Sequence, residues 1–246
     1  MAKYFVEDTS LTSVADAIRA KSGTTEVLEF PGGFVSAVEG ITAGGGGDTT
    51  LEDGLVTRTL TEYTNDRVTE IGTYAFVNNT TIETVSFPNV TDFKGSNNFQ
   101  SCTKLRSINF PKLQNAGGGN AFRGCTALTE AILPQVKAMP NFRECSALEK
   151  VDIGHPNRTG INFAIGAATF YGATVLDTVI IRKTDAIFGL VNISAFTGTP
   201  FASGGTGGTV YVPAALIEQY QQATNWSTLY AAGSMTFVAI EGSEYE

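Results

Sequence analysis

The chain has 246 residues, of which 42% are hydrophobic and 16% charged, so it is expected to fold rather than stay disordered. Its formal net charge is −8 and it has no Lys/Arg cluster, which makes nucleic acid and anionic membranes poor partners. It has no run of 18 apolar residues and no apolar segment at the N-terminus, so the sequence predicts neither membrane insertion nor a secretory signal.

Residues 1–43 predict a small helical module. A first helix is expected to start near Leu11 after a capping Asp or Ser/Thr, and to stop at Gly23. A second short helix is expected after Pro31. About forty residues are marginal as an isolated fold, so the module either caps the following domain or serves docking or oligomerisation. Docking is favoured because a linker separates the two parts.

That linker, residues 44–50, contains four consecutive glycines. Glycine runs of this kind predict a flexible tether. A phosphate-binding loop is disfavoured here, because no Lys-Ser/Thr pair follows the glycines.

Residues 51–209 predict a repeat solenoid of stacked coils, with short parallel strands and irregular or helical turns. Five phenylalanines are each followed by apolar or small residues 6, 9 and 11 positions later, and they are Phe76, Phe99, Phe122, Phe142 and Phe170. The gaps between them are 23, 23, 20 and 28 residues. A fixed internal core with variable spacers is typical of stacked coils. Each coil is expected to hold two extended pieces, of which the second covers positions +6 to +11. The first pieces are expected at 68–71, 90–93, 113–116 and 136–139.

The three cysteines, Cys102, Cys125 and Cys145, each lie three residues after a phenylalanine, so stacking puts them in one column. Buried free thiols are favoured, and a disulfide between adjacent coils stays open. A metal site is disfavoured, because the count is odd and no Cys-x-x-Cys or nearby His is present. A Thr or Ser follows at +4 in each coil and is expected to bond the backbone of its own turn.

A sixth, degenerate coil surrounds Phe196, and residues 210–246 predict a C-terminal cap of strand, helix and strand. The expected elements are the strand 210–212, an amphipathic helix over 214–220 and the strand 235–240. Solenoids need such a cap because the last coil otherwise exposes its apolar face.

Positions +8 and +10 of the second extended piece are expected to point outward and to form columns on one face. The candidate binding face consists of Ser107, Glu130, Lys150, Asn109, Ile132, Asp152 and Ile180. Ile132 and Ile180 are apolar in an outward column. Each is therefore either covered by a partner or a sign that the register is wrong.

The sequence predicts no catalytic, cofactor or metal site. The single histidine, His155, precedes Pro156 at a coil corner and is interpreted as a loop residue. No Gly-x-Ser-x-Gly or His-Glu-x-x-His motif and no calcium loop are present. Carboxylate pairs such as Glu149 with Asp152 are expected to be solvated, whereas acid–base work on a glycoside needs a desolvated one.

The repeat pattern Val-Thr-x-Ile-Gly-x-x-Ala-Phe-x-x-Cys-Thr-x-Leu-x-x-Ile-x-Phe-Pro resembles the BspA-like (treponemal) leucine-rich repeat. It is carried by Val68 to Phe76 and again by Ala121 to Leu128, and the resemblance covers about residues 68–230. The chain departs from the pattern at 157–170 and 183–209. BspA-like repeats in bacterial surface proteins are associated with adhesion to host proteins or other cells.

The stretches Asp8 to Gly23, Phe30 to Phe34 and Ala37 to Ile41 resemble a module of phage and prophage tail and other structural proteins of Firmicutes. Together the two resemblances imply a non-enzymatic phage structural or appendage protein, located in the virion and released by lysis. Residues 1–43 would bind virion proteins, and the repeats a host-surface protein, a glycan or another virion protein. The alternative is a bacterial surface adhesin of the BspA type, and the third hypothesis is a glycan-acting enzyme. Homo-oligomerisation stays open.

Overall fold

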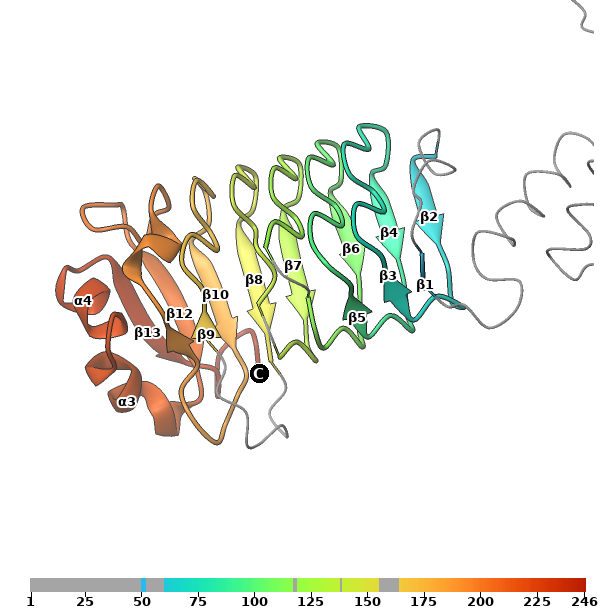
Figure 1. The fold of residues 1–246 in the computed structure, drawn as a ribbon. Coiled ribbons are helices and arrows are strands. Elements are labelled where there is room, and N and C mark those ends of the chain that lie inside the picture. Colours follow the sequence, from blue (N-terminus) through green and yellow to red (C-terminus); the bar gives the residue numbers. More distant parts are fainter. Residues whose placement is uncertain (1–49, 52–59, 117–118, 138, 155–163) are drawn as a thin grey trace, which may run out of the picture.

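The computed structural model describes residues 50–51, 60–116, 119–137, 139–154 and 164–246. The expected N-terminal module and His155 lie outside these residues. What is described is a row of parallel coils that runs from β1 to β13 (Figure 1). No helix in this part of the chain is long and apolar enough to cross a membrane.

The second extended pieces of the coils form short parallel strands, as predicted. One sheet holds β2 (Glu62–Thr64), β4 (Thr84–Ser86) and β6 (Ser107–Asn109). The next holds, in spatial order, β7 (Glu130–Leu133), β8 (Lys150–Ile153), β10 (Thr178–Ile181), β12 (Gly208–Val212) and β13 (Met235–Ala239). The pairing joins equivalent positions, so Ala131 pairs with Val151, and Val151 with Val179. The +9 register read from the sequence is therefore confirmed.

The first extended pieces form a smaller ladder. β1 (Thr50–Leu51), β3 (Glu70–Ile71) and β5 (Asp92–Phe93) pair in parallel, and Asp92 forms a further bridge with Asn115. Among the described residues of 136–139 no strand forms. Farther along, β9 (Ala164–Ile165) pairs with β11 (Gly189–Leu190), in the two segments where the chain departs from the repeat pattern.

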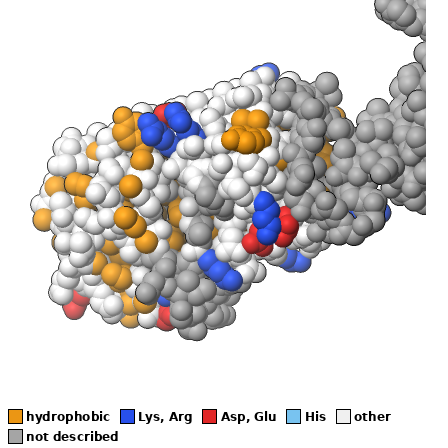
Figure 2. Space-filling model, in the orientation of Figure 1, with side chains coloured by type: hydrophobic (Ala, Val, Ile, Leu, Met, Phe, Trp, Pro, Cys, Tyr) orange, Lys and Arg blue, Asp and Glu red, His pale blue; other side chains and the backbone are white. Residues whose placement is uncertain are grey.

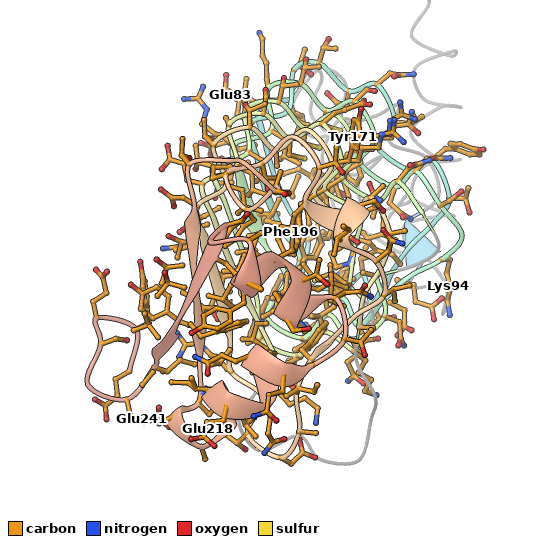
Figure 3. All side chains as sticks on the ribbon, turned by 90° about the vertical axis from the view of Figure 1, so that its left-hand side faces the viewer. Glu83, Lys94, Tyr171, Phe196, Glu218 and Glu241 are labelled. Carbon is orange, nitrogen blue, oxygen red and sulfur yellow. The ribbon has the colours of Figure 1, made fainter. Side chains whose placement is uncertain are left out.

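The repeated phenylalanines form a continuous stack along the axis of the coils. Their ring centroids are separated by 4.6 Å for Phe76–Phe99, 5.3 Å for Phe99–Phe122, 5.3 Å for Phe122–Phe142, 6.1 Å for Phe142–Phe170 and 5.3 Å for Phe170–Phe196. In the view from the C-terminal end, Phe196 lies at the centre of the coil (Figure 3). These rings are buried, so the stack is the main apolar filling of the solenoid.

The turns that carry the phenylalanines form a third hydrogen-bonded ladder, which the sequence did not predict. The backbone N–H of each phenylalanine donates to the next coil, for example from Phe76 to the Asn98 carbonyl at 2.8 Å. Two residues later a second N–H does the same, as from Ser101 to the Arg123 carbonyl at 2.7 Å. This +2 residue has a positive φ in every coil, and glycine provides it at Gly124, where φ is 73°.

The three cysteines are free and buried, as favoured from the sequence. Each thiol donates to the carbonyl of the phenylalanine one coil earlier, with Sγ–O distances of 3.0 Å for Cys102 and 3.1 Å for both Cys125 and Cys145. The column is therefore a set of small buried side chains that join successive coils. In the first coil Asn79 takes this place, and its Oδ1 accepts from the N–H of Thr81 and of Ile82.

These thiols are expected to be unreactive in the folded protein. Burial raises the pKa of the Cys125 thiol well above its ordinary value, which disfavours the thiolate that attacks disulfide reagents. Ellman's reagent should therefore detect no thiol in the native protein at mildly alkaline pH. It should detect all three in guanidinium chloride without a reductant. A native signal would contradict this packing.

Two of the hydroxyls at +4 bond the preceding coil and not their own turn, so the expectation was wrong for these two. Thr126 Oγ1 donates to the Thr103 carbonyl at 3.2 Å, and Thr174 Oγ1 to the Ser146 carbonyl at 3.3 Å. The acceptor is the equivalent residue of the preceding coil, because stacking brings that carbonyl within reach.

The C-terminal residues add helices to the end of the stack. η2 (Ile193–Phe196) carries the last stacked phenylalanine, and η3 (Ala214–Leu216), α3 (Ile217–Gln222) and α4 (Trp226–Ala231) follow β12. Trp226 lies 6.0 Å from the Phe196 ring and donates Nε1–H to the Phe188 carbonyl at 2.8 Å. The Tyr220 hydroxyl accepts from the Phe188 N–H at 2.7 Å. The indole thus adjoins the end of the phenylalanine stack.

Candidate binding surface

The outward side chains of the strands form the surface that the sequence proposed for binding. In the view along the axis, Glu83, which precedes β4, lies at the periphery on one side and Lys94, which follows β5, on another (Figure 3). Within each sheet the pairing register aligns the +8 and the +10 positions of successive coils. Ser107 and Asn109 therefore lie in the two outward columns of the first sheet, and the other five candidates lie in those of the second. They differ sharply in exposure.

Four of the candidates are exposed, and they come from the neighbouring strands β6 and β7. Ser107, Asn109, Glu130 and Ile132 are open to solvent, and Ile132 is 45% exposed in spite of its apolar side chain. The sequence flagged this isoleucine as an exception, and no residue described in the structure buries it. It is therefore the strongest single sign of a contact surface here.

A hollow of about 210 Å³ adjoins Ile132, with a lining formed by Arg106, Ser107, Ile108, Thr129, Glu130 and Ile132. It lies where β6 and β7, both fully described, are not joined in one sheet. Ile108 is half-buried here, whereas the +9 residues of the other coils are buried. Its successor Ala131 is the smallest residue of that column. The outer face is thus interrupted at this point.

The charged candidates are paired across neighbouring coils. Lys150 Nζ lies 2.8 Å from Glu130 Oε2, and this hydrogen bond raises the pKa of Lys150. On the face shown in Figure 2, positive and negative side chains adjoin near the centre, and other charged side chains stand apart. Exposed pairs of this kind contribute little to stability, about 0–1 kcal/mol. They give the face alternating charge rather than a field of one sign.

Asp152 and Ile180 are not open to solvent, which corrects the expectation for these two candidates. Asp152 is 9% exposed and Ile180 is fully buried. The register is nevertheless as predicted, since Ile180 pairs with Asp152 on one side and with Tyr211 on the other. Asp152 is held by Arg182, whose Nε and Nη2 donate to its carboxylate at 2.8 and 2.9 Å. Both residues face outward but are covered by other parts of the chain.

A second charged cluster lies on the turn side and was not predicted. Arg123 and Arg143 both bond Glu144, each at 3.1 Å, and Arg143 stacks over the Tyr171 ring at 4.7 Å. The hydrogen bond from Arg123 is the main cause that holds the pKa of Glu144 below its usual range. The sequence signal is the position directly after each phenylalanine, which holds Arg123, Arg143 and Tyr171 in successive coils.

Metal ligands and the carboxylate pair considered from the sequence can be checked on the described residues. Among them no three His, Cys, Asp or Glu side chains are grouped so as to hold a metal ion. The carboxylate pair considered from the sequence, Glu149 with Asp152, is not an isolated pair, because Asp152 is bonded by Arg182.

Comparison with known families agrees with this geometry. Residues 59–172 match the BspA type leucine rich repeat region. The match contains 6 copies and covers slightly less than half of the chain. The matched region runs from residue 59 to the coil of Phe170. The family matched is a repeat region and not a catalytic family.

Curated proteins and solved structures give two further comparisons. The curated proteins contain no match to the chain. Among solved structures, a leucine rich cell surface protein from Faecalibacterium prausnitzii A2-165 is similar at 23% identity, with a TM-score of 0.45. The matched region covers 72% of this chain and 47% of that protein, so the chain spans about half of its length.

These findings bear unequally on the functional hypotheses. Binding through BspA-type repeats agrees with the family match, and so does the alternative of a surface adhesin. The expected phage role receives no support from the matches. The module that motivated it, residues 1–43, lies outside the described residues.

Proposed function

We propose that the BspA-type repeats form a non-enzymatic binding domain of the adhesin kind, which holds a protein or glycan of another cell on the outer face of its strands. The observation that carries the proposal is the exposed Ile132 beside the hollow at the β6–β7 interruption. An apolar side chain flanked by polar, hydrogen-bonding neighbours is the usual composition of a contact centre with a polar rim.

The neighbours of Ile132 are suited to such a rim. Ser107 and Asn109 are exposed on β6, and Asn109 Nδ2 donates to the Ser86 hydroxyl at 2.8 Å. On the other side the Glu130–Lys150 pair offers both charges. Short side chains tied to their neighbours lose little entropy when a partner arrives, which favours binding.

The test is a binding screen with a matched pair of variants. The full chain is applied to an array of immobilised extracellular proteins and glycans, and at least one of them should be retained. Ile132→Arg should weaken that binding about tenfold or more, because it places a charge at the apolar centre. The control is Val191→Arg, at a residue 61% exposed that directly follows β11 and lies outside the sheet of β7.

Val191→Arg should leave binding unchanged, since both variants add the same charge at an exposed apolar position. Equal loss in both variants would point to nonspecific charge effects and refute the assignment to this face. Release of products from the arrayed glycans would instead favour the enzyme hypothesis.

A further inference from the structure

The segment 242–246 lies against the outer face of the second sheet, next to the proposed binding region. Figure 1 places the C-terminal end beside β8 and β10, and the contacts agree. Tyr245 is the residue that touches the sheet. Its neighbours there come from three successive strands or strand ends, namely Lys150, Arg182 and Tyr211.

Each of these neighbours contacts a different part of Tyr245. The Tyr211 ring meets its ring edge to face at 4.7 Å, and Lys150 Nζ lies 5.9 Å from its ring centroid. Arg182 Nη1 donates to its backbone carbonyl at 2.8 Å. An edge-to-face ring, a cation near the ring and a donor for the main chain are together the features that recognise an aromatic residue in a peptide.

The shape of the segment depends mainly on its own hydrogen bonds. Ser243 N–H and its hydroxyl both donate to the Ile240 carbonyl, at 3.0 and 2.7 Å. Gly242 N–H donates to the Glu246 carboxylate at 2.9 Å, and Tyr245 N–H to the Ser243 hydroxyl at 3.1 Å. The segment is a self-contained turn, so it can leave the sheet without breaking strand pairs.

The sheet region that it adjoins is the part of the binding face that is closed. Ile180 lies between Asp152 and Tyr211 in the +10 row, and it is buried without belonging to the phenylalanine core. A hollow of about 270 Å³ lies beside Tyr245, and its lining also includes Glu130 and Lys150 of the binding face. If the segment left, the row from Ile132 to Tyr211 would become one continuous surface.

We propose that residues 242–246 occupy, within the same chain, a site for an aromatic side chain of a partner protein. The site is formed by Lys150, Arg182 and Tyr211, and the segment has to leave before the partner covers the whole face. This inference rests on the proposed binding function of that face. A tethered segment has an effective local concentration in the millimolar range, so it competes strongly with any free ligand.

The first experiment measures binding of a fluorescein-labelled peptide with the sequence of residues 240–246 by fluorescence anisotropy. A variant that lacks residues 242–246 should bind the peptide at least tenfold more tightly than the full chain. A peptide with Ala in place of the tyrosine should not bind. Tyr211→Ala in the shortened chain should also abolish binding, because it removes the ring that contacts Tyr245.

A second variant keeps the length of the chain. Tyr245→Ala in the full chain should likewise gain peptide binding, and hydrogen exchange at β10 should become faster. If the shortened chain does not fold, Tyr245→Ala alone decides the question. A folded variant that binds the peptide no better than the full chain overturns the proposal and leaves the segment as a structural strap only.

The array described above separates this inference from the function on which it rests. The partner retained by the full chain should bind the shortened chain more tightly. Unchanged array binding together with failed peptide binding would refute the role of the segment and leave the binding face standing. If the peptide binds but the array retains no protein or glycan, the aromatic site is supported. The proposed binding function of the face is then refuted.

Discussion

Replacement of Phe122 by alanine is expected to lower the free energy of unfolding by about 3–5 kcal/mol, the range found for large-to-small changes of a buried aromatic residue. Phe122 is fully buried and stacks at 5.3 Å on both Phe99 and Phe142, and it also contacts Phe93 and Phe110. Its removal leaves a cavity in the middle of the stack, where no other side chain can fill the place of a ring. Urea unfolding followed by circular dichroism measures the change.

The controls separate cavity formation from loss of an aromatic ring. Phe122→Leu keeps most of the volume and should cost less than half as much as the alanine variant. Tyr74→Ala removes an aromatic residue that is 57% exposed on a turn, and should change stability by about 0.5 kcal/mol or less. Equal effects of Phe122→Ala and Tyr74→Ala would contradict the role of the stack.

The single tryptophan gives this experiment a second readout. Trp226 lies at the far end of the stack, beyond Phe142 and Phe170. If its fluorescence changes together with the circular dichroism, the coils unfold as one unit. Separate transitions would show that the damage stays near Phe122, as expected for a chain of nearest-neighbour interactions.

Asn98→Ala is expected to lower the free energy of unfolding by about 2–4 kcal/mol, because it leaves buried carbonyls without a donor. Asn98 is fully buried, and its Nδ2 donates to the carbonyls of Gly72, Lys94 and Ile71 at 2.7, 3.0 and 3.2 Å. The bonds to Ile71 and Gly72 tie the coil of Phe99 to the coil before it, and the bond to Lys94 lies within the same coil. The same urea titration measures the loss.

Two further variants test the cause of that loss. Asn98→Asp should cost more than Asn98→Ala, since it replaces a donor with a charged acceptor that faces the same carbonyls. Asn109→Ala removes an exposed asparagine with one surface hydrogen bond, and should have an effect of about 0.5 kcal/mol or less. An effect of Asn98→Ala as small as that of Asn109→Ala would contradict the assignment.

The sequence predicted the repeat core well because its spacing is rigid. In every coil the inward residues of the strand lie at the same offsets from the phenylalanine. Strands of neighbouring coils therefore pair at equivalent positions, even where the two coils differ in length. The pairing of Val151 with Val179 holds although 28 residues separate the two phenylalanines of these coils. A constant spacing within the coil is thus sufficient to fix which side chains face inward.

The exposure of the outward columns could not be predicted in the same way. Ile132 and Ile180 hold the same position in their coils, yet one is exposed and the other buried. Ile180 lies beside Tyr211 in the paired strand, and Tyr211 in turn contacts Tyr245 of the C-terminal segment, which follows the repeats. Position within a repeat predicts the direction of a side chain, but not what another segment places over it.

The hydrogen bonds between coils could not be predicted either, because the sequence pattern describes each coil by itself. Thr126 bonds the Thr103 carbonyl rather than its own turn, and Arg123 bonds Glu144 of the next coil. Such contacts depend on the distance between two coils. That distance is set by the size of the side chains packed between them, which a repeat pattern does not describe. The β6–β7 interruption, beside the small Ala131, is of the same kind.

The hydrogen bonds that join successive coils have a consequence for the length of the molecule. On the strand, on the turn and through the cysteine thiols, hydrogen bonds run from one coil to an adjacent one. A copy of the segment 122–141 inserted before Phe142 would find matching donors and acceptors on both sides. Because strands in a sheet are about 4.8 Å apart, adding or removing one coil would lengthen or shorten the solenoid by about that distance, with both ends unchanged.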